Sequence, residues 1–287
     1  MVLTHIFPAA NITELVILTE RLAFRRLEEK MPGGGAEIRE VLVKNYKLII
    51  QYDGSRYYGW QRQPEQTTVQ GKLESVLSAM TDRPVEVIGA GRTDAGVHAR
   101  GMAANVFLET ESSCQEIRDY LNRYLPDDIA VLAVKEASPR FHARYNAIGK
   151  TYRYTCYDGE VKSVFDRKYC YRLPEKPDLD RMWAAAEVLK GEHDFRNFCV
   201  NPRMKKSTVR NVDRIEIKRE GDYLTFTFHG NGFLQNMVRI LVGTLLEVGF
   251  GRMTVEQVEA VLINPDRQKA GPTAPALGLC MMSVDYD

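Results

Sequence analysis

The stretch VEVIGAGRTDAGVHARGMAANVFL, residues 85–108, is the most informative for the fold, because it predicts two strands joined by one loop, around which the other elements can be ordered. Residues 85–88 alternate as a half-buried strand does, and residues 97–109 are again rich in strand-forming side chains. Asp94 therefore falls on a strand-to-strand connection. Loops held by a rigid scaffold are where catalytic side chains usually lie, so this connection is the first candidate for a functional site.

The residues around Asp94 leave its carboxylate unobstructed. Gly91 and Gly96 can take positive φ or let the backbone approach a ligand closely, and Arg92 can hold the carboxylate ionised by lowering its pKa. This pattern favours a nucleophilic aspartate. The residues Thr-Asp-Ala-Gly are also the chemistry of an ordinary Asx turn with a glycine exit, so the loop by itself leaves both interpretations open.

Outward from this loop, the strand and helix patterns follow a definite order. The elements predicted for the first half are a strand over residues 47–52, a helix over 69–80, strands over 85–88 and 97–108, a helix over 114–125 and a strand over 129–134. This β-α-β-β-α-β order is that of the split ferredoxin-like unit.

The second half repeats this order with insertions. Its predicted elements are a strand over residues 151–157, a helix over 180–189, strands over 211–218 and 224–229, helices over 233–248 and 255–262, and a strand over 280–285. We therefore expect an α+β protein with two ferredoxin-like (split β-α-β) halves, whose antiparallel sheets line a central basic cleft.

Three segments follow from this pattern: residues 1–44 as an N-terminal extension, residues 45–139 as a ferredoxin-like domain with the catalytic Asp loop, and residues 140–287 as a second such domain with the active-site Tyr and Arg. The glycine-rich residues 31–35 would uncouple the extension from the rest. We expect the extension to be disordered, or to be a start-site artefact with translation beginning at Met31, Val41 or Val43.

The composition limits the class of protein. A chain of 287 residues with 44% hydrophobic content can form two ordinary domains with a real core. The five cysteines contain no Cys-x-x-Cys pair and the five histidines no paired-ligand spacing, so we expect no metal site. No apolar stretch reaches the length of a membrane span, and no signal peptide is evident. We expect a cytoplasmic protein without a membrane partner.

The distribution of charge matters more than its sum. A formal net charge of +1 argues against a nucleic-acid-binding protein. However, residues 137–157 and 195–212 contain basic side chains and no acid; these are Arg140, Arg144, Lys150, Arg153, Arg196, Arg203, Lys205, Lys206 and Arg210. Basic segments of this kind in an otherwise balanced chain indicate a groove for a polyanion.

Several motifs from Tyr46 onward resemble those of the TruA-type tRNA pseudouridine synthases. The loop GRTDAGVHA, residues 91–99, matches that family's signature residue for residue. The other motifs occur along the chain in the family's order. Three precede the loop and five come after it: YDGS (52–55), YGWQRQ (58–63), TVQGKLE (68–74), FHAR (141–144), KTYRY (150–154), GEHDF (191–195), GFLQNMVR (232–239) and TAPALGL (273–279). An ordered set of motifs is far more specific than any one of them.

The resemblance implies an isomerase that converts uridine to pseudouridine in the anticodon stem-loop of tRNAs, at positions 38, 39 and 40 in standard tRNA numbering. The reaction breaks the N1–C1′ bond of a uridine, turns the uracil and rejoins it through C5, so it needs no cofactor and no metal. The family is a homodimer in which one tRNA reaches across both subunits. The partners implied are therefore tRNA and a second copy of the chain.

The resemblance also implies the catalytic residues. Asp94 is the expected nucleophile, with attack at C6 of the uracil or at C1′ of the ribose left open, and Tyr152 is expected to stack on the uracil and to help move the C5 proton. Arg239 lies in an apolar predicted helix, where a guanidinium needs a carboxylate partner, and we expect that partner to be Asp94. For Tyr152 the alternative to a catalytic role is that of an ordinary core residue in a strand. For Arg239 the alternative is a charged residue on a solvated helix face.

Binding of the substrate requires further residues. A uridine in a stem must leave its stack before Asp94 can reach it, and the resemblance gives Arg92 the task of stabilising the vacated space. We assign phosphate contacts, which position rather than specify the tRNA, to Arg144, Lys150, Arg196, Lys205 and Lys206. Ordinary surface charge is the alternative for the lysines. His98 and His193 receive no chemical role.

Two other classes of function remain open. An RNA-binding module could keep the groove without catalysis, although Asp94, Tyr152 and Arg239 together argue against this. A glycosyl-transfer enzyme could exchange a base rather than isomerise it, but such chemistry usually needs a second acid or base near the nucleophile. The sequence places no second carboxylate beside Asp94.

Overall fold

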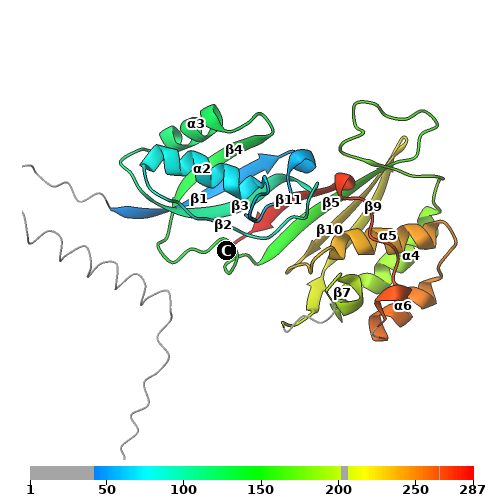
Figure 1. Cartoon of the computed structure of the whole chain (residues 1–287). Helices are drawn as coiled ribbons and strands as arrows, with labels where there is room; N and C mark the ends of the chain where they lie inside the picture. The colour runs from blue at the N-terminus through cyan, green and yellow to red at the C-terminus, as the bar shows by residue number, and fades with distance from the viewer. Residues whose placement is uncertain (1–41, 202–205, 265) are drawn as a thin grey trace, which may run out of the picture. The chain divides into compact units, whose positions relative to one another are not determined.

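A computed structural model describes residues 42–201, 206–264 and 266–287 (Figure 1). The predicted extension over residues 1–44 therefore lies outside the described residues except for its last three, and Lys205 and Arg203 lie outside them too.

One large sheet runs through the described residues in the order β4-β1-β3-β11-β5-β10-β9, with β2 paired to β3 and β6 paired to β5. All pairings in it are antiparallel except β11 with β3 and β6 with β5. The strands are β1 (Val43–Tyr52), β2 (Val87–Gly89), β3 (His98–Glu109), β4 (Ile129–Ala137), β5 (Gly149–Tyr157), β6 (Tyr171–Arg172), β9 (Arg214–Glu220), β10 (Tyr223–Gly230) and β11 (Leu279–Asp285). Strands β7 (Gly191–Asp194) and β8 (Val209–Val212) form a small second sheet.

Helices lie along both halves of the large sheet (Figure 1). They are α2 (Val69–Thr81), α3 (Cys114–Tyr124), α4 (Leu179–Leu189), α5 (Met237–Gly249) and α6 (Val255–Ile263). Their starts follow from capping side chains: Ser113 and Glu116 form a capping box at α3, as Thr254 and Gln257 do at α6. Short 3-10 turns, η1 (Gly54–Arg56), η2 (Phe195–Phe198), η3 (Arg267–Lys269) and η4 (Ala276–Gly278), complete the described secondary structure.

The strand order is the same in both halves of the sheet. The first half has the order β4-β1-β3-β2 and the second β11-β5-β10-β9, so in each half the last strand lies beside the first. The predicted α+β class, with a mostly antiparallel sheet, is confirmed. Strand β11 joins the halves, because Cys280 and Met281 pair with His98 and Ala99 of β3 while β11 also pairs with β5.

Two predicted boundaries are wrong. The helix predicted from residue 233 begins at Met237, because Asn236 takes a left-handed conformation with φ of 60° that a helix cannot include. The strand predicted over residues 211–218 is two strands, because the chain leaves the small sheet for the large one at Asp213. The other predicted elements lie within a few residues of their observed bounds.

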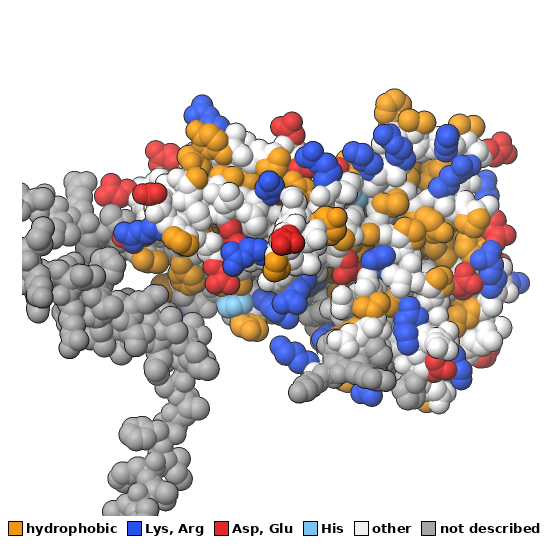
Figure 2. All heavy atoms as spheres, in the orientation of Figure 1, with side chains coloured by type: hydrophobic (Ala, Val, Ile, Leu, Met, Phe, Trp, Pro, Cys, Tyr) orange, Lys and Arg blue, Asp and Glu red, His pale blue; other side chains and the backbone are white. Residues whose placement is uncertain are grey.

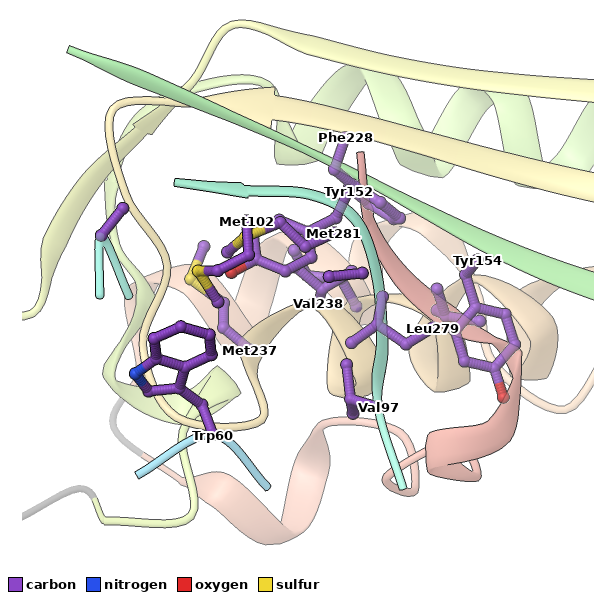
Figure 3. Packing of buried hydrophobic residues seen from close by; sticks show 14 of the residues in the cluster. Trp60, Val97, Met102, Tyr152, Tyr154, Phe228, Met237, Val238, Leu279 and Met281 are labelled. Atoms are coloured by element: carbon purple, nitrogen blue, oxygen red, sulfur yellow. The ribbon is translucent and has the colours of Figure 1, made fainter. Parts of the chain in front are cut away.

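The hydrophobic core continues across the junction of the two halves. Figure 3 shows Met102 of β3 and Met281 of β11 packed near Tyr152 of β5 and Val238 of α5. Met102 and Met281 are completely buried. Because β11 supplies buried side chains between the halves, the loop that carries Asp94 and the helix that carries Arg239 are held against one core.

Candidate active site

Hydrogen bonds on both sides of the Asp94 side chain hold the loop between β2 and β3 in place. The hydroxyl of buried Thr93 is hydrogen-bonded to that of Tyr52 at 2.8 Å, and its carbonyl accepts from the Trp60 amide at 3.1 Å. The Asp94 carbonyl accepts from the Val97 amide at 3.1 Å, which closes a β-turn. The loop therefore contains a backbone turn, which leaves the Asp94 carboxylate available for another partner.

Two glycines make this loop conformation possible. Gly96 has φ of 78°, in the region that side chains rarely adopt. Gly59 has φ of 88°, and a Cβ built on it would lie 2.5 Å from the Thr93 carbonyl oxygen. The segment before α2 therefore passes directly beneath the Asp94 loop, and only a glycine allows this approach.

Arg239, in the first turn of α5, is the charged partner of Asp94. Its Nη1 lies 3.5 Å from Asp94 Oδ2, and the Arg239 and Asp94 side chains are 16% and 28% exposed. Its Nε donates to the Ala274 carbonyl at 2.7 Å and its Nη1 to Asn236 Oδ1 at 2.6 Å. Arg239 is thus aimed at Asp94 and does not lie on a solvated helix face.

Burial and charge act on Asp94 in opposite directions. Burial raises the pKa of Asp94, and the nearby Arg239 guanidinium lowers it without cancelling the effect of burial. The result is a carboxylate that is partly withdrawn from water beside a fixed positive charge. Such a group is more nucleophilic than one in water.

Tyr152 lies in the middle of β5, where it pairs with Phe228 of β10 and Met281 of β11. It is 7% exposed, and its ring packs edge-to-face on Phe233 at 5.2 Å between centroids. Burial, with the nearby charge of Asp94, raises the pKa of its phenol far above neutrality. The Tyr152 hydroxyl makes no hydrogen bond to any described residue, so the ring is held while the oxygen stays free.

The candidate substrate-binding residues divide into two groups. Lys150 is half-buried, and its Nζ donates to the Ala90 carbonyl at 2.8 Å, directly before the Asp94 loop. The exposed residues are Arg92, Arg144, Arg196 and Lys206. Figure 2 shows Lys and Arg side chains spread over the face that it draws, with Asp and Glu among them.

The exposed basic residues differ in the bonds that they make. Arg196 forms an ion pair with Asp194 at 3.4 Å, and among the described residues no hydrogen bond or ion pair joins Arg196 or Lys206 to Asp94, Tyr152 or Arg239. Lys205 lies outside the described residues. Only Arg92 and Lys150 of this group lie on, or bond to, the loop segment around Asp94.

His98 has a structural place beside the site. Its Nδ1 accepts from the Gly54 amide at 3.1 Å, and its Nε2 lies 3.0 Å from the Lys168 carbonyl and 3.2 Å from that of Leu277. Burial lowers the pKa of His98, so its neutral form is favoured. His98 thereby connects the end of the Asp94 loop to two segments of the second half.

Sequence reasoning missed the residues that orient Arg239 and Tyr152. Asn236 and Ala274 hold the guanidinium, and Phe233 packs on the tyrosine ring. The spacing of three residues between Asn236 and Arg239 is a weak signal that was available in the sequence. The contact with Ala274 bridges distant segments and has no such signal.

In the described ranges, no group of three or more His, Cys, Asp or Glu side chains is placed to hold a metal ion. Nor does any helix in those ranges have the length and apolar character needed to cross a membrane.

Comparison with known proteins gives a consistent result. A family described as tRNA pseudouridine synthase matches residues 48–146 and 185–287. Proteins named tRNA pseudouridine synthase A are similar to the chain: that of Bacillus sp. (strain KSM-64) is 46% identical over 245 residues, and that of Clostridium kluyveri is 43% identical over 244. Each alignment covers 85% of this chain and 100% of the relative.

Among solved structures, an archaeal box H/ACA sRNP Nop10-Cbf5 complex is similar to the chain with 12% identity and a TM-score of 0.30, over 83% of this chain and 45% of that one. A likeness this weak carries no argument about the fold.

Proposed function

The chain belongs to the tRNA pseudouridine synthase family, and we propose that Asp94, Tyr152 and Arg239 perform its chemistry. The chain isomerises uridine to pseudouridine in the anticodon stem-loop of tRNA. The observation that supports these catalytic roles best is the Arg239–Asp94 ion pair beside a phenol with no hydrogen-bond partner among the described residues.

In the proposed mechanism, the target uridine leaves its stack and its uracil enters the site beside Tyr152. Ionised Asp94 attacks C6 of the uracil or C1′ of the ribose, and the N1–C1′ bond breaks. The uracil turns and C5 bonds to C1′. The bond to Asp94 breaks as C5 displaces the carboxylate from C1′, or by elimination from C6 after C5 has bonded, and the proton lost from C5 is balanced by one gained at N1. Arg239 favours the ionised form of Asp94 in a partly buried position, and Tyr152 stacks on the base and takes part in the proton transfer.

The finer features of the fold and substrate belong to the same proposal. We assign residues 45–139 and 140–287 to two ferredoxin-like domains whose sheets line a basic cleft; the matching strand orders of the two halves support this. The proposed target uridines are at positions 38, 39 and 40. Arg92 stabilises the space left by the flipped base. The phosphate contacts are Arg144, Lys150, Arg196, Lys205 and Lys206.

The assembly that we propose is a homodimer in the cytoplasm, with one tRNA reaching across both subunits. The apparent sedimentation mass of the purified chain, alone and with tRNA, tests the dimer directly.

The proposed function is tested with an unmodified tRNA transcript, incubated with the chain without added metal or cofactor. Pseudouridine is then located by carbodiimide adducts that stop reverse transcription. We expect stops at positions 38, 39 and 40 wherever the transcript carries uridine, and none with the Asp94→Ala variant. Stops only at other positions would overturn the assigned target.

The same assay separates the two other classes of function. Binding of tRNA with no pseudouridine from the unaltered chain would indicate an RNA-binding module. Incorporation of labelled free uracil into tRNA would indicate base exchange, because an isomerase keeps the original base throughout.

A further inference from the structure

Lys150 is attached to the backbone that leads into the Asp94 loop. Its Nζ donates to the Ala90 carbonyl at 2.8 Å. A Cβ built on the next residue, Gly91, would lie 3.4 Å from the same nitrogen. The ammonium therefore contacts the chain four residues before Asp94, and any ligand that binds the ammonium is in contact with the loop through this bond.

The Lys150 ammonium has no counter-charge among the described residues. No carboxylate of those residues lies within 4.0 Å of its Nζ, although 15 ion pairs of a lysine or an arginine with a carboxylate occur among them. Burial, with the charges of Arg144 and Arg210, lowers the pKa of Lys150 to about 8. Three cations without an anion repel one another in the free protein, and a bound anion would relieve that repulsion.

Arg210 reaches this position because β8 packs against the end of β10. A Cβ built on Gly230, which pairs with Lys150, would lie 2.5 Å from the Asn211 carbonyl. The Nη1 of Arg210 donates to the carbonyls of Ser207 and Val209 at 2.9 and 2.6 Å. Backbone carbonyls thus hold one side of the guanidinium.

Other charged groups on the elements around Lys150 are engaged elsewhere. Asp94 is paired with Arg239, and Asp285 of β11 is bound to His229 of β10. Arg92 is exposed on the loop itself. Arg144 and Arg210 are therefore the groups whose charge acts on Lys150.

We propose that Lys150, Arg144 and Arg210 form a seat for one phosphodiester of the tRNA backbone beside the Asp94 loop. The inference rests on the proposed function, since it requires a tRNA substrate. It differs from a general basic surface because the Lys150 ammonium is fixed on the Ala90 carbonyl and, above about pH 8, takes up a proton when the phosphate binds.

The test is the pH dependence of the Kd for an unmodified tRNA transcript. All proteins carry Asp94→Ala, so that no turnover accompanies binding. With Lys150 present, the Kd should rise with pH above about 8, approaching tenfold per pH unit, because a proton is taken up on binding. Lys150→Arg, which keeps its charge, should bind with a Kd that varies much less over this range.

Further variants separate the seat from a structural role. Lys150→Met should weaken tRNA binding about tenfold at neutral pH and reduce the slope of log Kd against log salt concentration by about 1. Arg210→Met should reduce the slope similarly, and Lys176→Met, at an exposed lysine, should not. Should Lys150→Met fail to fold, the comparison with Lys150→Arg still decides the question.

Equal pH dependence in the Lys150 and Lys150→Arg proteins would overturn the seat. The seat would also be overturned if Lys150→Met had a lower melting temperature but an unchanged slope of log Kd against log salt concentration. That result would mean that Lys150 only anchors the loop. Neither result bears on the proposed function, whose failure would instead be the absence of pseudouridine after incubation with the unaltered chain.

Discussion

The Arg239 guanidinium lies 3.5 Å from Asp94 Oδ2 and is held in place by the Ala274 carbonyl and the Asn236 side chain. The Ala274 contact comes from the backbone of a distant segment, and the Asn236 contact comes from the residue at the start of α5. The position of the positive charge is therefore set before any substrate binds, which is the condition for electrostatic catalysis without reorganisation.

Replacement of Arg239 by Met should slow pseudouridine formation by about 10²-fold or more, since a preorganised charge is removed. The pKa of Asp94, already raised by burial, should rise further without its cation. Because the ionised form is the nucleophile, the acid limb of the pH–rate profile should move to higher pH. Arg239→Lys should keep part of the rate; an acid limb that does not move would contradict the pairing.

Tyr152 supplies a ring and a hydroxyl that can be tested separately. Tyr152→Phe keeps the edge-to-face packing on Phe233, so melting temperature and tRNA affinity should change little. The rate should fall by about 10²–10⁴-fold if the phenol moves the C5 proton. Tyr152→Leu should lose affinity as well. A Phe variant with the unaltered rate would restrict Tyr152 to stacking.

Gly59 should be intolerant of a side chain. Gly59→Ala combines positive φ with a Cβ 2.5 Å from the Thr93 carbonyl, so we expect a loss of about 1–3 kcal/mol in unfolding free energy and a lower kcat. Gly221→Ala is the matched control, because its φ is 58° but nothing lies within 4 Å of the added Cβ. It should lose only about 1 kcal/mol, with kcat unchanged.

His98 and His229 should give stability profiles of opposite sign. Burial lowers the pKa of His98, so its stabilising contribution is complete above about pH 6.5 and falls as the pH drops below that value. For His229, burial lowers the pKa but hydrogen bonds with Asp213 and Asp285 outweigh it and raise the pKa. Its contribution is complete below about pH 6.5 and is lost as the pH rises through the raised pKa.

Unfolding free energy measured in urea at several pH values checks this pair. His98→Gln should flatten the acid side of the profile and His229→Gln the neutral-to-alkaline side. If His98→Gln left the acid side unchanged, the neutral state assigned to His98 would be wrong.

The elements that the sequence predicts well are those with local signals. Thr68 caps α2, and an apolar pattern continues from it, so the predicted helix over residues 69–80 and the observed Val69–Thr81 nearly coincide. The start of α5 was not predictable, because the apolar pattern continues through residues 233–236 while the left-handed Asn236 interrupts the helix. The position of β11 between β3 and β5 depends on pairing between residues far apart in the chain.

For the site, the predicted pairing of Asp94 with Arg239 is confirmed. The resemblance indicated Asp94, and an arginine in an apolar helix indicated that it needs a carboxylate partner. That Lys150 is half-buried and bonded to Ala90 could not be predicted, because a lysine in a basic segment has the same pattern on a surface or beneath a loop. The catalytic roles of Asp94, Tyr152 and Arg239 stay predictions until they are measured.

The most direct test of the account is release of tritium from [5-³H]uridine-labelled tRNA by the unaltered chain and by Asp94→Asn, which keeps the shape of the side chain and removes its charge. Both proteins should bind tRNA and melt cooperatively, and burial of a neutral amide in place of a carboxylate should not lower the melting temperature. We predict release by the unaltered chain and none above background by Asp94→Asn. Comparable release by the two proteins would contradict the assignment of Asp94 as the nucleophile.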